Sequence, residues 1–162
     1  MRANVASSIY PMASYKTVGD LQVECRAACQ GDEADLEAVI RQAAVCRSIS
    51  VGDGYDVVFQ HSPPDDDEIF HAFWGILSDP SGVVPSVSCC ELMRTKYRLQ
   101  EVAFASMFYK RQLPDLSVTQ WFVTTFPQKP ERLGRIYRNM QHAGHVDVCA
   151  WLAAAHPECL SD

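Results

Sequence analysis

The chain has 162 residues and a mass of 18.1 kDa, a length that is most simply one domain. Apolar residues make up 48% of it and charged residues 21%, which is ordinary for a globular protein and excludes a wholly disordered chain or a coiled coil. The sequence contains no run of about 18 apolar residues, so it predicts no transmembrane helix. The N-terminal residues lack the apolar core and cleavage site of a signal peptide, so we expect none.

The net charge of −6 is unevenly distributed along the chain. Residues 1–93 carry a net charge of −9, residues 94–142 carry +6, and residues 143–162 carry −3. A positive segment inside an acidic protein predicts attraction to an acidic partner, or to the acidic first half of the chain itself.

The chain contains 7 cysteines and no secretory signal precedes them. This number is odd, so a reduced, intracellular and most simply cytoplasmic protein is a better interpretation than a disulfide framework. Free cysteine packs as a small hydrophobic residue, and we expect that role for most of them.

The predicted domain organisation has one arm and one folded unit. Residues 1–15 show no apolar periodicity and are expected to form a flexible N-terminal arm. Residues 16–162 are expected to form a single helical domain. Prolines and a glycine predict an insertion loop near residues 78–90.

The first elements begin with Thr17, which is followed by Asp20 in a pattern typical of a helix start. Apolar residues at helical spacing follow it, and a second apolar face covers residues 36–44. Residues 51–60 contain a turn and a short β-branched run, which predicts either an extended connection or a small strand.

The remainder of the chain is interpreted as helices separated by prolines and glycines. The acidic run 65–68 is typical of a solvated N-cap and first helical turn. A cation site is the weaker alternative, because the run lacks the alternating ligands and internal glycine of a calcium loop. The helices predicted after it cover residues 69–77, 90–111 (as one helix or a broken pair), 115–126, 133–143 and 146–155. Such short segments predict antiparallel helix hairpins.

Residues 116–127 and 146–157 share a pattern at a constant offset of 30 residues. The matched pairs are Val118 with Val148, Trp121 with Trp151, and Pro127 with Pro157. Trp74 and Pro80 repeat the same internal spacing more faintly. Recurring helical units stack because one hairpin cannot bury both of its faces alone.

These residues resemble the ankyrin-repeat family. The segment GHVDVCAWL at 144–152 is similar to the second-helix signature of an ankyrin repeat, and CRAACQGDEADLEAVI at 25–40 is similar to a first repeat. The T-P-L-H motif that opens a standard repeat is absent. The resemblance implies an all-α fold, an ankyrin-like short solenoid of about four helix-turn-helix hairpins. The units it implies are 18–47, 55–80, 90–127 and 131–160.

The resemblance also implies a non-catalytic module that binds another protein, as an adaptor or effector. The contact residues it implies are Lys110, Arg111, Arg132, Arg135, Arg138 and Asn139. Tyr109 and Tyr137 are further candidates, because interfaces favour Tyr and Arg, although a core position is the simpler interpretation of Tyr137. The residues assigned to the structural core are Trp74, Trp121, Trp151, Val118 and Val148.

Histidines and cysteines near the C-terminus have the spacing H-x2-H-x3-C-x6-H-x2-C, and zinc favours such ligands. They are His142, His145, Cys149, His156 and Cys159. The resemblance instead places His145 at the turn, buttressing it by hydrogen bonds, and Cys149 in the core. We therefore expect no metal and no cofactor, and keep a zinc-stabilised helical domain as an alternative.

Cys89 and Cys90 stand at a predicted helix start, where the helix dipole can stabilise a thiolate. With His71 or His142 as base they would make a nucleophilic site in the 61–90 region, so an enzyme or effector of unfamiliar type is the second alternative. Two half-buried structural thiols are the simpler interpretation.

The arginines of 94–142 would also suit a nucleic acid. The sequence pI near 5.3 disfavours this, because nucleic-acid-binding domains are usually basic as a whole. The sequence therefore favours a protein partner with an acidic surface.

Overall fold

The computed structural model describes residues 17–52 and 56–161; the predicted arm at 1–15 lies outside this range. The elements in chain order are α2 (Val18–Ala28), α3 (Glu33–Gln42), β1 (Val45–Val51), β2 (Asp56–Ser62), α4 (Asp66–Ser78), α5 (Val87–Thr95), α6 (Glu101–Ala105), the 3-10 helix η2 (Ser106–Tyr109), α7 (Leu116–Thr125), α8 (Pro130–His142), α9 (Val146–Ala155) and the 3-10 helix η3 (Pro157–Leu160). The fold is mostly helical, as predicted.

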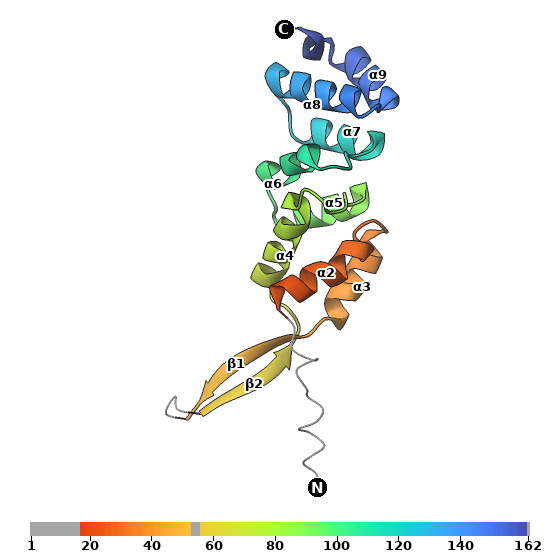
Figure 1. Cartoon of the computed structure of the whole chain (residues 1–162). Coiled ribbons are helices and arrows are strands. Elements are labelled where there is room, and N and C mark those ends of the chain that lie inside the picture. The colour runs from red at the N-terminus through yellow and green to blue at the C-terminus, as the bar shows by residue number, and fades with distance from the viewer. Residues whose placement is uncertain (1–16, 53–55, 162) are drawn as a thin grey trace.

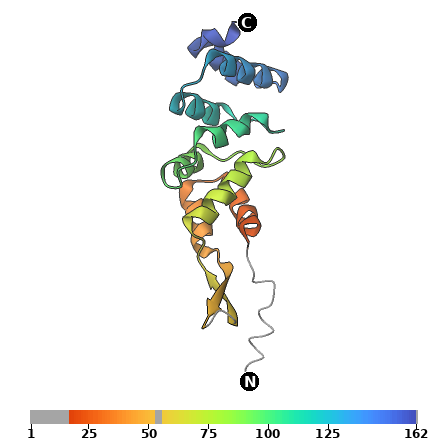
Figure 2. The ribbon, with the colours of Figure 1, turned by 90° about the vertical axis from the view of Figure 1, so that its left-hand side faces the viewer.

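The helices form two columns that run the length of an elongated molecule (Figure 1). Helices α2, α4, α6–η2 and α8 follow one another in one column, and α3, α5, α7 and α9 in the other (Figures 1 and 2). Each layer therefore covers an apolar face of the next, which is how short helices without a large core of their own are stabilised. Among the described residues, no helix combines the length and apolar character needed to cross a membrane.

Short polar side chains cap the N-termini of most of these helices by accepting a hydrogen bond from a backbone N–H. Thr17 and Asp20 form a capping box at α2. Asp65 and Glu68 form another at α4, so the acidic run is an N-cap and first turn, as predicted. These caps fix where each helix enters its layer.

Gly144 ends α8 in the way that the sequence predicted. Its φ is +81°, a conformation that favours glycine. The N–H of Gly144 donates to the carbonyl of Gln141 at 3.2 Å, and that of His145 donates to Met140 at 2.9 Å. This is a Schellman ending, and it turns the chain directly into α9. The predicted buttressing by His145 is wrong, because its side chain makes no capping bond.

The core is continuous through both columns and rich in phenylalanine. Phe73, Phe104 and Phe122 are completely buried. Val118 and Val148 are buried as predicted, with exposures of 4% and 0%. The core therefore connects layers that are far apart in sequence.

The tryptophans are less buried than predicted. Trp74 is 37% exposed and stacks on Phe70 of its own helix at 6.1 Å, so its assignment to the core is wrong. Trp121 and Trp151 are half-buried. Trp121 donates from Nε1 to Glu91 Oε2 at 2.7 Å, because an indole N–H near the surface needs a partner.

The β1–β2 hairpin departs from the predicted all-α fold. Its strands pair antiparallel from Val45 opposite Ser62 to Val51 opposite Asp56. β-Branched residues on both strands favour this conformation. The small strand that was one of two alternatives for 51–60 is therefore β2, and its partner, β1, lies before the turn.

Two predicted unit boundaries also fail. The unit 55–80 contains strand β2, and the unit 90–127 contains α5, which starts at Val87 behind the cap of Ser86. Helix α5 lies in the column of α3 and α7. It therefore follows α4 in the stack and does not open a unit with α7.

Candidate functional site

An open groove of about 260 Å³ lies between the α6–η2 segment and α8; we call it the α6–α8 groove. Both walls belong to one column of the stack, and α7 runs beside them (Figure 1). Its apolar lining is Val102, Ala105, Phe108, Tyr109, Phe122 and Ile136. Its polar lining is Ser106, Arg132, Arg135 and Asn139. The groove thus has an apolar floor and a basic rim.

The α6–η2 wall presents large apolar groups to solvent. Val102 is 62% exposed and Tyr109 is 61% exposed, whereas Phe104 and Met107, between them in sequence, are fully buried. The change from α-helix to 3-10 helix at Ser106 occurs within this wall. Val102 and Tyr109 therefore supply exposed contact area without being needed for the core.

The α8 wall supplies the charge because the helix is strongly amphipathic. Leu133, Ile136 and Met140 are buried, and Arg132 and Arg135, one turn apart, lie beside Ile136 at the groove. Arg132 is half-buried and Arg135 is exposed. Three of the six predicted contact residues, Arg132, Arg135 and Asn139, therefore converge on this groove.

Asn139 ties the two walls together. Its Nδ2 donates to the carbonyl oxygen of Phe108 at 3.3 Å. This bond joins α8 to η2 across 31 residues of sequence. Asn139 therefore holds the end of the groove, and part of its hydrogen-bonding capacity is already used.

Four cations of the described residues are ion-paired, whereas the arginines at the rim, like exposed Arg41 and Arg98, are not. Arg26, Arg47, Arg94 and Lys96 each form a salt bridge with a carboxylate. Arg132, Arg135 and Arg138 form none with any described residue. The α8 surface thus carries three arginines that are not ion-paired with any described residue, beside one acid, Glu131.

Two further depressions adjoin this rim. One is lined by Arg132 and Arg135 together with Glu101, Gln128, Lys129 and Glu131. The other is lined by Arg135 and Arg138 together with Glu131. The predicted contact residue Arg138 therefore lies on the same helix surface as the groove but does not line it.

Lys110 was predicted as a contact residue, and this prediction is wrong. The side chain is only 5% exposed. Its Nζ donates to the carbonyl oxygens of Ile76 at 2.6 Å and Val83 at 2.9 Å. Pro80 lies four residues after Ile76 and has no N–H to offer, so the lysine satisfies this carbonyl at the end of α4. Burial lowers the pKa of the Lys110 amine.

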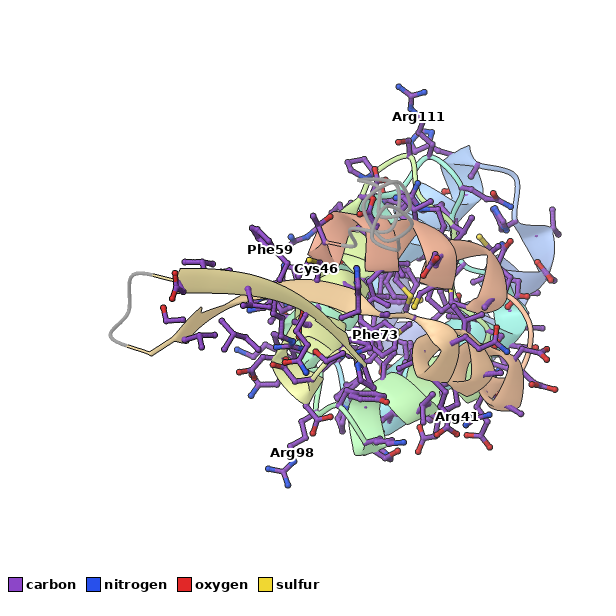
Figure 3. The ribbon with its side chains drawn as sticks, turned by 90° about the horizontal axis from the view of Figure 1, so that it is seen from below. Arg41, Cys46, Phe59, Phe73, Arg98 and Arg111 are labelled. Carbon is purple, nitrogen blue, oxygen red and sulfur yellow. The ribbon has the colours of Figure 1, made fainter. Side chains whose placement is uncertain are left out.

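Arg111, the neighbour of Lys110, points away from the molecule (Figure 3). Its backbone N–H donates to Pro80 at 2.9 Å, which fixes the backbone only. The side chain is exposed, but it does not line the α6–α8 groove.

Cys89 and Cys90 lie in the core at the start of α5. Both are completely buried. Burial raises the pKa of the Cys89 thiol and raises that of Cys90 well above its usual value. An activated thiol needs the opposite shift. His71 is exposed and contacts the ring of Phe70. The geometry therefore gives these thiols a packing role.

The histidines and cysteines near the C-terminus do not converge. No group of three or more His, Cys, Asp or Glu among residues 17–52 and 56–161 is placed to hold a metal ion. Cys159 is buried, whereas His142 is exposed. His156 contacts the Trp151 ring. The zinc-stabilised alternative is not supported by this arrangement.

The hairpin is a surface feature of which the sequence indicated at most the second strand. It extends well beyond the outline of the helices (Figure 3). The cross-strand pair Ile49 and Val58 is 40% and 50% exposed, and Val57 is 54% exposed. Its base is anchored, because Arg47 Nε donates to Ser62 Oγ at 2.7 Å and its guanidinium also binds Asp65, the N-cap of α4, and Glu68 in the first turn of α4.

Val102, Phe108 and Phe122 are groove residues that sequence reasoning missed. Val102 and Tyr109 are seven residues apart, a helical spacing that alone could have paired them on one face. The sequence could not show that this face opposes α8.

No family model matches this chain, and searches of curated proteins and of solved structures also find no match. The resemblance to ankyrin repeats thus remains a prediction made from the residues at 25–40 and 144–152.

Proposed function

We propose that this protein is a non-catalytic recognition module that binds a partner protein in the α6–α8 groove. The observation that carries this proposal is the convergence of exposed Val102 and Tyr109 with Arg132 and Arg135 around one groove. Exposed aromatic and apolar side chains beside arginine are the composition typical of protein interfaces.

The ankyrin-like architecture is part of the same proposal. Its support is the pair of antiparallel helices α8 and α9 joined by the tight turn at Gly144, and the arrangement of the other helices in two columns. Stacked helix pairs of this kind commonly use one face of the stack for binding.

An intracellular, reducing location also belongs to the proposal. All seven cysteines are free thiols, and most of them are buried. Disulfides form and persist in oxidising compartments, so this pattern fits a reduced environment.

The test compares the proteins captured from cells by matched variants. The groove variant is Val102→Ser with Tyr109→Ser, which removes exposed apolar area and leaves the core intact. The control is Val23→Ser with Val146→Ser, because these valines are similarly exposed, at 64% and 77%, and lie on α2 and α9. A hairpin variant, Ile49→Thr with Val58→Thr, completes the set.

We expect a partner that the wild type and the control variant retain and the groove variant loses. The recovered protein is then purified, and its dissociation constant is measured with all four chains. A groove variant that binds every partner as tightly as the wild type contradicts the proposal. Loss in the hairpin variant alone would place the interface on β1–β2 instead.

A further inference from the structure

The arginines without a salt bridge at the groove indicate the sign of the charge that the partner carries. Residues 94–142 carry a net charge of +6 in a protein of net charge −6. Within the described part of the chain, Arg132 and Arg135 have no salt-bridge partner, unlike Arg47 and Arg94. Glu101 and Glu131 line the neighbouring depression, but among the described residues neither forms a salt bridge with these arginines; Gln128 donates to Glu101 at 2.9 Å. Carboxylates on a partner would form salt bridges with these arginines.

The floor of the groove favours a ligand that does not bind by charge alone. Phe108, Phe122 and Ile136 line it, and Val102 and Tyr109 form an exposed apolar edge. A partner must therefore bring apolar side chains as well as acids. The volume of about 260 Å³ lies below the roughly 300–1,000 Å³ of small-molecule pockets, and it suits a few anchoring side chains from a larger partner.

The walls determine the backbone conformation that fits. Both walls are helical segments. Among the described residues the groove is lined by helices and by no strand edge, so an extended peptide would find no ladder of donors and acceptors there. A helix satisfies its own backbone and presents side chains at i, i+3 and i+4. Arg132 and Arg135 are also one helical turn apart.

We infer that the α6–α8 groove takes an acidic amphipathic helix of the partner protein, with apolar anchors over Val102 and Tyr109 and carboxylates against Arg132 and Arg135. This inference rests on the proposed function and specifies the chemistry of the partner. RNA is the competing ligand for a basic helix, but the apolar floor and the pI near 5.3 favour a protein.

The test is a selection from an unbiased peptide library displayed on phage. The full-length wild type is the target, and the Val102→Ser, Tyr109→Ser chain removes peptides that bind elsewhere. We expect the enriched peptides to carry Leu, Phe or Trp at helical spacing, with Asp or Glu one turn apart beside them. Basic, uncharged or strand-forming sequences would overturn the inference, as would a selection that yields no peptide specific for the wild type.

The enriched peptides are then measured by fluorescence anisotropy against two arginine variants. Arg132→Gln with Arg135→Gln should weaken binding about tenfold or more and flatten its dependence on salt. Arg41→Gln with Arg98→Gln makes the same change in net charge at exposed positions outside the groove and should leave binding unchanged. An equal loss of binding in both double variants would show that only net charge matters, and would overturn the inference.

Labelled single-stranded RNA is measured against the same variants. RNA that binds the wild type more tightly than any peptide, and is lost in the Arg132, Arg135 pair, would overturn the inference. A protein captured from cells that needs Val102 and Tyr109 but not the two arginines would also overturn it, while leaving the proposed function in place.

Discussion

The helical stack and the β1–β2 hairpin use their apolar residues in opposite ways. In the stack, Phe73 and Phe104 are completely buried, whereas Val57 and Val58 of the hairpin are 54% and 50% exposed. A two-stranded ribbon is marginally stable by itself in water. Packing between layers therefore holds the stack together. The hairpin is held by anchoring at the hairpin base, chiefly through Arg47.

The α6–α8 groove lies between these extremes. Its floor residue Phe122 belongs to the core at 0% exposure, and its edge residue Tyr109 is 61% exposed. Binding surface and packed core are therefore adjacent within one layer, whereas in the hairpin they are separate. Substitutions can test this division directly.

The largest effect should come from the core of the stack. Phe73→Ala removes a buried ring whose centroid lies 5.3 Å from that of Tyr97 in an edge-on contact. We expect the free energy of unfolding to fall by about 3–5 kcal/mol. Trp74→Ala, at the adjacent and 37% exposed position, should cost about 1 kcal/mol. Urea unfolding of both variants measures the difference, and equal costs would show that the stack does not bury this face of α4.

Alkaline pH should also act on the stack. Burial raises the pKa of Cys25 and of Cys29 to about 12, from a usual value of 9.0. Because the folded state keeps both protons longer, stability is full below pH 9 and is lost as pH rises toward 12. The steepest loss per thiol is about 1.4 kcal/mol for each pH unit.

Urea unfolding at pH 8 and at pH 10 measures this dependence. The Cys25→Ala, Cys29→Ala chain should show a flatter dependence than the wild type. An unchanged slope would contradict the complete burial of these two thiols in the core.

Loss of the anchor should loosen the hairpin and leave the stack folded. Arg47→Ala removes the bonds to Ser62, Asp65 and Glu68. Because the salt bridges of Arg47 with Asp65 and Glu68 are partly exposed, we expect the free energy of unfolding to fall by at most about 1 kcal/mol. Hydrogen exchange should accelerate in residues 45–62 and stay unchanged in α8. Arg41→Ala, exposed on α3, is the control, and similar exchange in both variants would contradict the anchoring.

The smallest effect should come from the hairpin surface. Ile49→Thr with Val58→Thr replaces an exposed cross-strand pair with another residue that favours strands. We expect the free energy of unfolding to change by about 0.5 kcal/mol or less. A loss of several kcal/mol in thermal or urea unfolding would show that the hairpin packs against the fold more closely than its exposure indicates.

Local signals in the sequence predicted the helices well. Thr17 and Asp65 act as N-caps and Gly144 adopts a positive φ. Each of these effects acts within a few residues, so it could be predicted from the local sequence. The same is true of the alternation of Arg132 and Arg135 with buried Leu133 and Ile136 along α8. These features require no knowledge of the partner layer.

Burial that depends on distant segments could not be predicted in this way. Lys110 resembles a surface cation in sequence, and only the approach of Ile76 and Val83 shows that it completes the end of α4. Trp74 resembles a core residue, but its helix turns Phe73 inward instead. Likewise, β1 could not be predicted because its register depends on pairing with β2.

The most direct test of partner binding at the α6–α8 groove is hydrogen exchange of the full chain, alone and in complex with a protein or peptide recovered above. We predict slowed exchange in residues 101–109 and 130–142, with residues 45–62 unchanged. Protection confined to residues 45–62 would contradict this, and would assign recognition to the hairpin.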